Sequence, residues 1–494
     1  MIIRDTNENG QPVYRQTITR AVIDERGRTL DEILSLGYAA NSVPTIDMKL
    51  PFDVPVVTIK CPEIIANASD NSISRLTTAQ NSVGTIDKED KDMEGIATDA
   101  DGNVHCNMKV EFVSQSLHFE DYCAISLQGQ TSLGHPKKNF TIDFLEKHQF
   151  GRWLEFDSFH LKGYYVDWIH SRDWVANRLW EQVCLSKSVT VRRPYLAFNN
   201  FDNDYRQRND MGVLCHVDAF PVELYINDVY WGLYTWRLKK HRDNYFLGKS
   251  DVQHIQIDPS TLVNFDSFAW SQIEIRNPKS DSGNSSFPEG QEPNAGEVKT
   301  AILGFVSAIS SATTKADFEA ILNVDSVIDS LVFYDFICAW DILIRNTLWT
   351  TWDAKHFSML PYDLDSSFGY GYTNTTDWSS TLLPANTNVF TFYKDNRNTI
   401  GSWFERFLIL YKDEISDRYS LYRSKGVFSV YNVMELFSSF SAWVGQGVYK
   451  RDIGRWSYPT NGYGQHGFKD SLARIQSFME DRVEYLDSKY SQSN

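Results

Sequence analysis

Apolar runs bounded by turn residues dominate the chain from about residue 44 to residue 260. These runs are rich in β-branched and aromatic residues, a composition typical of strands, and they include VPVVTIKCP, NMKVEFVS, YCAISLQG and KKNFTIDFLE. A further pair of runs in PVELYINDVYWGLYTW is joined by IND, which is typical of a hairpin turn. The pattern predicts a lobe built mainly from β-strands.

Helical spacing of apolar residues becomes frequent later in the chain. The run SVIDSLVFYDFICAWDIL predicts one strong helix and LARIQSFMEDRVEYLDSKY predicts another, while VDWIHSRDWVANRLWEQVCL predicts a helix between the strand runs. Residues 270–300 are rich in Ser, Gly, Pro and Asn, which predicts a surface loop or an insertion. Strands first and helices later indicate an α+β fold, with a sheet-rich lobe at about 44–260 and a mainly helical lobe at 301–494.

The first 43 residues differ in character from the rest of the chain. They are polar and turn-rich, apart from a short helical signal in which Thr29 is a candidate cap before Leu30, Ile33 and Leu34. This arm is too small to form a core of its own. It is either an extension packed on the main domain or a segment that attaches the protein to an assembly.

Composition narrows the class of protein. A chain of 494 residues with 42% hydrophobic residues can form a large core, and its net charge of −16 argues against a general basic surface for nucleic acid. The chain contains no membrane-spanning apolar run and no apolar signal peptide. Six cysteines without a CxxC pair favour buried thiols and a reducing site of synthesis. The expected location is the cytoplasm of the producing cell or a virion.

Isolated carboxylates stand in two otherwise apolar runs. WDILIRNTLW contains Asp341 and, five positions later, Asn346; LPYDLDSSFGYGY contains Asp363 and Asp365. A plausible strand pair around WTTWDAKHFSMLPYD joins the two runs. Phosphoryl transfer requires a carboxylate that orients the attacking hydroxyl and oxygen ligands that hold Mg²⁺. Spacing alone favours a simpler interpretation, in which Asp341 binds backbone donors and DLDSSFG is a turn.

A kinase also requires a cation on the phosphates. Lys137 and Lys138 stand at the entrance to a strand, after a turn in GQTSLGHPKK whose backbone N–H groups could approach phosphate. Considered alone, they are better explained as two solvated lysines. The triplet His241-Arg242-Asp243 has the letters of a kinase catalytic loop, but Gly248 stands where that loop has Asn, so the triplet is interpreted as coincidence.

Taken together in order, these segments resemble the CotH-type atypical kinase family, named for a bacterial spore-coat protein. The resemblance runs from about residue 44 to the C-terminus. It rests on QGQTSLGHPKKNFTIDF, WLEFDSFHLKGYYVDWIHSRDWVANRLW, FPVELYINDVYWGLYTW, WDILIRN, LPYDLDSSFG, GRWSYP and SFMEDRVEYLD.

The resemblance implies an atypical protein-kinase-like fold that binds ATP with Mg²⁺ or Mn²⁺ and phosphorylates protein hydroxyls. It implies that Asp341 is the catalytic base and that Asn346, Asp363 and Asp365 are metal ligands. Lys137 or Lys138 would hold the phosphates. The chain departs from the family pattern at Gln128–Thr131, at Leu238 in place of a Glu, and in the apolar residues between Asp341 and Asn346. These departures concern catalysis more than the fold.

Two other hypotheses remain open. The arm segment AVIDERGRTLDEILS resembles the leading segments of bacteriophage tail proteins. A catalytically degenerate scaffold in a phage tail or virion, binding partner proteins, a receptor or carbohydrate, is therefore an alternative. Aromatic residues in the late loops would suit such a surface, although ordinary packing explains most of them: Tyr370, Tyr372, Trp378, Tyr458 and Tyr463. The second hypothesis is a metal-dependent hydrolase that uses the same carboxylates. Such an enzyme needs a group that activates water, and the sequence offers no convincing one.

Overall fold

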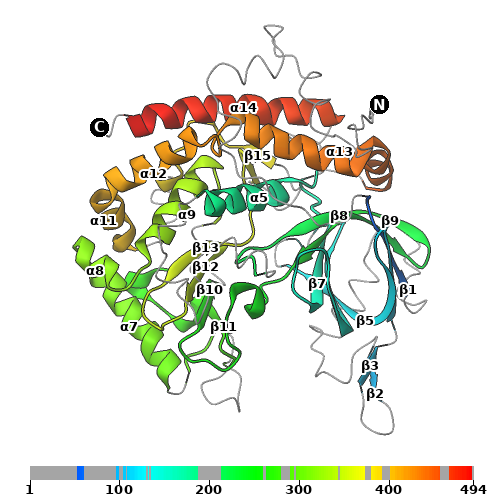
Figure 1. The fold of residues 1–494 in the computed structure, drawn as a ribbon, viewed down its shortest axis with the longest axis horizontal. Helices are drawn as coiled ribbons and strands as arrows, with labels where there is room; N and C mark the ends of the chain where they lie inside the picture. Colours follow the sequence, from blue (N-terminus) through cyan, green and yellow to red (C-terminus); the bar gives the residue numbers. More distant parts are fainter. Residues whose placement is uncertain are drawn as a thin grey trace, which may run out of the picture.

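The computed structural model describes most of the chain beyond residue 52 (Figure 1). The described segments are 53–60, 96–98, 104–106, 108–129, 135–167, 169–186, 213–259, 263–279, 296–342, 345–372, 380–391, 401–456 and 467–491, with a few positions between them. The predicted arm at 1–43 lies outside these residues. Six of the seven sequence segments of the resemblance lie wholly or mainly inside them; GRWSYP is described only to Trp456.

A closed β-barrel forms the N-terminal lobe. Its strands follow the order β1-β4-β5-β6-β7-β9-β8, and neighbours are antiparallel except for β1 and β8, whose parallel pairing closes the barrel. The strands are β1 (Val56–Lys60), β4 (Met108–Val113), β5 (His118–Gln128), β6 (Asn139–His148), β7 (Phe156–Lys162), β8 (Ala219–Ile226) and β9 (Val229–Leu238). A small two-stranded sheet, β2 (Ile96–Thr98) and β3 (Val104–Cys106), lies below the barrel in Figure 1, next to β5.

Aromatic side chains fill the barrel. The ring centroids of Phe150 and Trp236 lie 5.4 Å apart, and those of Phe112 and Phe150 lie 5.1 Å apart. The predicted hairpin is confirmed as β8 and β9, joined by Asn227 and Asp228 with φ of 47° and 65°. Two successive positive φ values match the twist of hairpin strands, and Asn and Asp tolerate them.

A second, four-stranded antiparallel sheet lies beside the barrel, in the order β11-β10-β12-β13. It consists of β10 (Ile255–Pro259), β11 (Ile273–Asn277), β12 (Thr347–Thr351) and β13 (Ser358–Pro361). The predicted strand pair around WTTWDAKHFSMLPYD is confirmed as β12 and β13. The interpretation of 270–300 as a loop needs correction, because residues 273–277 form β11. The buried, alternating Ile273 and Ile275 stabilise this strand within a segment of otherwise loop-like composition.

Helices surround this sheet and make the C-terminal lobe mainly helical (Figure 1), as predicted. In the figure α13 and α14 run across the top of the molecule, and α5 lies beneath them between the barrel and the other helices. The helices are α5 (Arg172–Leu185), α7 (Glu297–Ser311), α8 (Lys315–Glu319), α9 (Val324–Phe336), α11 (Ser402–Leu410), α12 (Lys412–Ser424), α13 (Val430–Arg455) and α14 (Gly467–Ser491). Smaller elements are η3 (Arg242–Tyr245), η4 (Phe265–Ser267), η5 (Trp270–Gln272), β14 (Tyr370–Tyr372) and β15 (Ser380–Leu382).

Helix α9 ends earlier than the sequence predicts. The apolar pattern continues to Leu343, but the helix ends at Phe336, and Cys338 adopts a φ of 53°. Residues 337–340 and Ile342 remain buried after the helix has ended, so apolar periodicity could not mark its end. Asp341 therefore lies outside α9, between this helix and β12.

The cysteines and the apolar character of the helices were both subjects of expectations from composition. Cys123, Cys184, Cys215 and Cys338 are buried, as expected of structural cysteines. Among the helices in the described segments, none is both long and apolar enough to cross a membrane.

Candidate functional site

A cavity of about 300 Å³ is lined by residues of both lobes. The four predicted residues Asp341, Asn346, Asp363 and Asp365 all line it. The other residues of its wall are Gln128, Gly129, Ser132, His135, Asn139, Lys162, Val166, Asp167, Lys240, Asp258, Pro259, Glu274, Arg345, Tyr362, Ser366 and Tyr370.

The β12–β13 pair brings the two predicted segments together. Its register places Thr347 opposite Pro361, so Asn346 and Tyr362 lie side by side just beyond the paired residues. The Tyr362 amide accordingly donates a hydrogen bond of 2.9 Å to the Asn346 carbonyl. Asp363 follows immediately, which explains how residues seventeen positions apart in the sequence share one wall of the cavity.

Asp363 and Asp365 both line the cavity, and the residue between them is buried. Leu364 is 1% exposed and packs in the core. In extended backbone, side chains at positions i and i+2 point to the same side. The alternation of two cavity-lining aspartates with a core leucine follows this pattern.

Asp341 is half-buried in the loop that follows α9. The indole N–H of its neighbour Trp340 donates a hydrogen bond of 2.9 Å to the carbonyl of Tyr370. This contact fixes the loop against the segment after Asp365. Tyr370, a candidate for an exposed aromatic surface, is itself 2% exposed.

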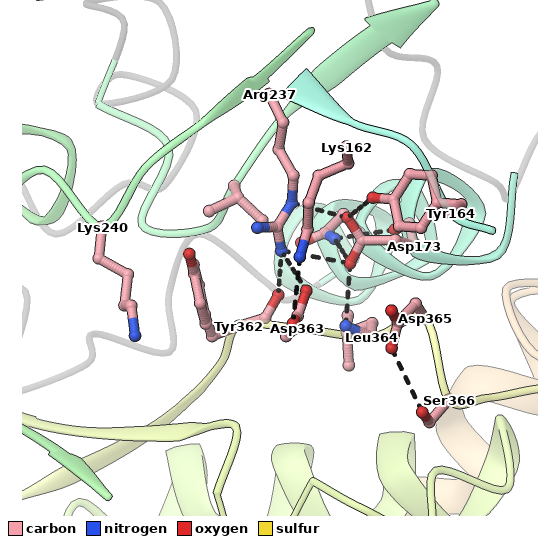
Figure 2. A network of polar contacts seen from close by, with 12 residues as sticks. Lys162, Tyr164, Asp173, Arg237, Lys240, Tyr362, Asp363, Leu364, Asp365 and Ser366 are labelled. Atoms are coloured by element: carbon pink, nitrogen blue, oxygen red, sulfur yellow. Dashed lines mark hydrogen bonds and ion pairs between the residues drawn. The ribbon is translucent and has the colours of Figure 1, made fainter. Parts of the chain in front are cut away.

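Two cations contact Asp363, as Figure 2 shows. Its Oδ1 lies 3.0 Å from Nη2 of Arg237 and its Oδ2 lies 3.5 Å from Nζ of Lys162. Burial alone would raise the pKa of Asp363, but the charges of Lys162 and Arg237 hold this pKa below its usual value. For Asp365, burial and then the charge of Asp363 raise the pKa to about 7.

Asp173, in the first turn of α5, is a residue that sequence reasoning did not assign to the site. Its Oδ2 accepts hydrogen bonds of 2.8 Å from Nε of Arg237 and 2.9 Å from the hydroxyl of Tyr164. Its Oδ1 accepts a hydrogen bond of 2.9 Å from the Leu364 amide (Figure 2). Asp173 therefore connects α5 both to the barrel and to the segment that carries Asp363.

Lys137 and Lys138 do not line the cavity. Lys137 is fully buried, and its Nζ donates to Asp452 at 2.9 Å and to the Leu233 carbonyl at 2.6 Å. Burial lowers the pKa of Lys137 to about 8, against the opposite effect of Asp452. Burial also lowers the pKa of Lys138.

Two other lysines line the cavity. Lys162 comes from β7, and Lys240 comes from the segment after β9. Lys162 ends β7, in which Phe159 and Leu161 fill the barrel while the alternate residues His160 and Lys162 face away from its core. The two-residue period of this strand was the sequence signal that could have identified Lys162. The His241-Arg242-Asp243 triplet lies at η3 and does not line the cavity.

The cavity oxygens suit a cation that arrives with its own ligands. Within the described residues, no three His, Cys, Asp or Glu side chains come together as a metal cage. Asp363, Asp365 and the amide of Asn346 nevertheless give hard oxygen donors on one cavity. Mg²⁺ is usually bound by one or two carboxylates, with phosphate and water completing its coordination. The donor set therefore fits a divalent cation such as Mg²⁺ or Mn²⁺ that brings further oxygen ligands with it.

Comparison with known proteins gives one family. The sequence model of the family described as CotH kinase protein matches residues 125–486. This span begins within β5, ends in α14 and contains every residue of the cavity wall. No curated protein sequence matches the chain.

Proposed function

The chain belongs to the CotH kinase family, and on that premise we propose that it transfers the γ-phosphate of ATP to hydroxyl groups of a protein, with Mg²⁺ or Mn²⁺. One observation carries the proposal. Asp341, Asn346, Asp363 and Asp365 come from two separate segments, yet all of them line one cavity together with a lysine. In the simpler interpretation, Asp341 binds backbone donors and DLDSSFG is only a turn. That interpretation gives no reason for the four side chains to line the same cavity.

Asp341 is the proposed base. In phosphoryl transfer, a carboxylate orients the acceptor hydroxyl and takes its proton as the new P–O bond forms. Asp341 is half-buried on the cavity wall, and the Trp340–Tyr370 hydrogen bond fixes its loop. It is thus held in place while keeping access to the cavity.

Asp363, Asp365 and Asn346 are the proposed metal ligands. When bound, Mg²⁺ or Mn²⁺ would neutralise charge on the β- and γ-phosphates. Burial of Leu364 and the β12–β13 register hold the three oxygen donors on one wall, so that they need no rearrangement of the backbone to converge.

Lys162 is the proposed phosphate-binding cation. Its Nζ lies next to Asp363, and a flexible lysine can exchange a carboxylate for a phosphate oxygen by side-chain rotation. Gly129, which also lines the cavity, has a φ of 109°, and a Cβ there would lie 2.0 Å from Oγ of Ser132. Gly129 is exposed, and the absence of a side chain leaves its own backbone open to a close ligand.

The departure at Leu238 has a counterpart in the structure. Leu238 is fully buried in the barrel, whereas the preceding Arg237 pairs with Asp173 of α5. An acid from the helix thus meets a cation on the strand, although the strand lacks the family's Glu. We infer that an ion pair still joins α5 to the barrel despite this departure.

The test is transfer from γ-labelled ATP with Mg²⁺ or Mn²⁺, to the protein itself and to a generic acceptor protein. Labelling should disappear in Asp363→Ala and in Asp341→Asn. The matched control is Asp228→Asn at the exposed turn of the β8–β9 hairpin, which should label as wild type does. Equal labelling of wild type and Asp363→Ala would refute the assignment. No labelling, with no thermal shift by ATP and metal, would favour the degenerate scaffold.

A further inference from the structure

Asp363 is held by two cations in different ways. Lys162 reaches it at 3.5 Å, the outer limit of a hydrogen bond, from a side chain with four rotatable bonds. Arg237 is fully buried and donates at 3.0 Å to Asp363 and at 3.1 Å to the carbonyl of Tyr362. Its guanidinium also stacks over the Tyr362 ring, 4.7 Å from the centroid. Arg237 is therefore fixed, whereas Lys162 is able to exchange.

The anchor of Arg237 is Asp173. The guanidinium meets this carboxylate with Nε at 2.8 Å and Nη2 at 3.4 Å, a two-point contact that a lysine cannot reproduce. Asp173 is 1% exposed, so the pair is shielded from solvent. Because Asp173 already balances the charge of Arg237, Asp363 retains negative charge for a further cation.

Asp173 also contacts the segment of Asp363 directly, because its Oδ1 accepts a hydrogen bond of 2.9 Å from the Leu364 amide. Two connections thus run from α5 to this segment, one through Arg237 and one through the backbone (Figure 2). Helix α5 is buried over its whole length and packs against α13 and α9. The place of α5 in the fold therefore fixes the place of the carboxylate.

We propose that Arg237 is a positioning residue for metal binding, which ties Asp363 to Asp173 of α5 and stays in place while Lys162 moves to the phosphates. This inference rests on the proposed function. Residues that orient a metal ligand from outside the coordination sphere commonly change metal affinity by about 10- to 100-fold when replaced. The same range is expected for Arg237→Lys, which keeps the positive charge and loses the two-point contact.

The experiment compares Arg237→Lys with Arg178→Lys in the full-length protein. Arg178, on α5, is a matched control. It is also buried and donates a hydrogen bond of 2.5 Å to Asp218, but it does not line the cavity. Two readouts are measured for each variant: the dissociation constant of Mn²⁺ in the presence of ATP, and hydrogen exchange of a peptide covering 360–368 without ATP. Both variants should melt at lower temperature than wild type. Arg237→Lys alone should bind Mn²⁺ about tenfold or more weakly and exchange faster at 360–368.

The outcomes separate this inference from the proposed function. Unchanged exchange at 360–368 in Arg237→Lys, or unchanged Mn²⁺ affinity despite faster exchange, overturns the positioning role. An equal loss of Mn²⁺ affinity in Arg178→Lys overturns it as well, since the effect would then follow from stability. If Asp363→Asn binds Mn²⁺ in the presence of ATP as tightly as wild type does, the proposed function is refuted, and with it the role of Arg237 in metal binding.

Discussion

Lys137 donates a hydrogen bond of 2.9 Å to Asp452, although 315 positions separate the two residues in the chain. Both side chains are buried, at 0% and 1% exposure. The pair joins the turn before β6 to α13 and thereby connects the barrel with the C-terminal helices. A lysine that sequence reasoning assigned to phosphate thus has a partner that only the fold supplies.

Replacing one partner of this pair should destabilise the protein strongly. Lys137→Met leaves the carboxylate of Asp452 buried without its cation, and breaking a buried ion pair in this way costs about 3–5 kcal/mol. Urea unfolding measures the loss. Lys137→Met combined with Asp452→Leu should recover part of it, because no charge is then left buried. A Lys137→Met variant of normal stability that has lost phosphate transfer would instead support the sequence-based assignment of Lys137 to phosphate.

Lys162→Met should affect activity more than stability. We expect loss of phosphate transfer by about 100-fold or more, because the phosphates lose their cation. The loss of stability should be smaller than in Lys137→Met, because Arg237 still pairs with Asp363. Labelled-phosphate transfer and urea unfolding are measured on the same preparations. The matched control is Lys239→Met, a lysine that follows β9 and is absent from the cavity wall. Unimpaired transfer by Lys162→Met would exclude its proposed role.

The buried His170 should make the protein sensitive to acid. Burial, and then the charge of Lys137, lower the pKa of His170 to about 4, against the effect of Asp452. As pH falls below about 6.5, the unfolded chain takes up a proton on this imidazole before the folded protein does. Unfolding is therefore favoured progressively from pH 6.5 to about 4, by up to about 3 kcal/mol.

Chemical unfolding across this pH range tests the effect. His170→Asn suits the site, because His170 has a φ of 56° and Asn tolerates that conformation. The variant should be less stable at pH 7 and lose less stability between pH 6.5 and 4. The exposed His118→Asn should keep the wild-type slope. An unchanged slope in His170→Asn would contradict the prediction.

Gly369 should resist substitution. Its φ is +77°, and a Cβ at this position would lie 2.6 Å from the ring of Phe478 on α14. Gly369→Ala is expected to cost about 1–3 kcal/mol in the free energy of unfolding. The control is Gly304→Ala in α7, where a Cβ meets nothing within 4 Å. That change should stabilise the protein by about 0.5–1 kcal/mol. A neutral Gly369→Ala would show that Phe478 yields easily.

Deleting residues 1–43 tests the predicted attachment arm. The family match begins at residue 125 and does not include the arm. We expect the shortened protein to melt and to transfer phosphate as the full chain does. If the arm is an attachment segment, the shortened protein should no longer co-purify with virions from the producing cell. Retained association would place the attachment elsewhere in the chain.

Much of the fold could be predicted from local pattern. The barrel strands other than β7, the Asn227–Asp228 hairpin, the β12–β13 pair and α14 follow from apolar runs and turn residues, which act over a few positions. Local pattern failed where burial came from distant parts of the chain. It extended α9 through the buried loop that holds Asp341, and it missed both β7, which ends at Lys162, and β11, which lies within a loop-like segment.

The sequence by itself determined which chemical groups are present and the order in which they occur. Asp341, Asn346, Asp363 and Asp365 were identified as a set because an ordered series of short segments resembles one family. Only the tertiary structure decided which groups meet: it paired Lys137 with Asp452, brought Lys162 and Arg237 to Asp363, and added Asp173 from α5. The physical reason is that an ion pair depends on distance in space. Strand and helix periodicity is local, whereas these contacts arise when the barrel, α5 and the second sheet pack together.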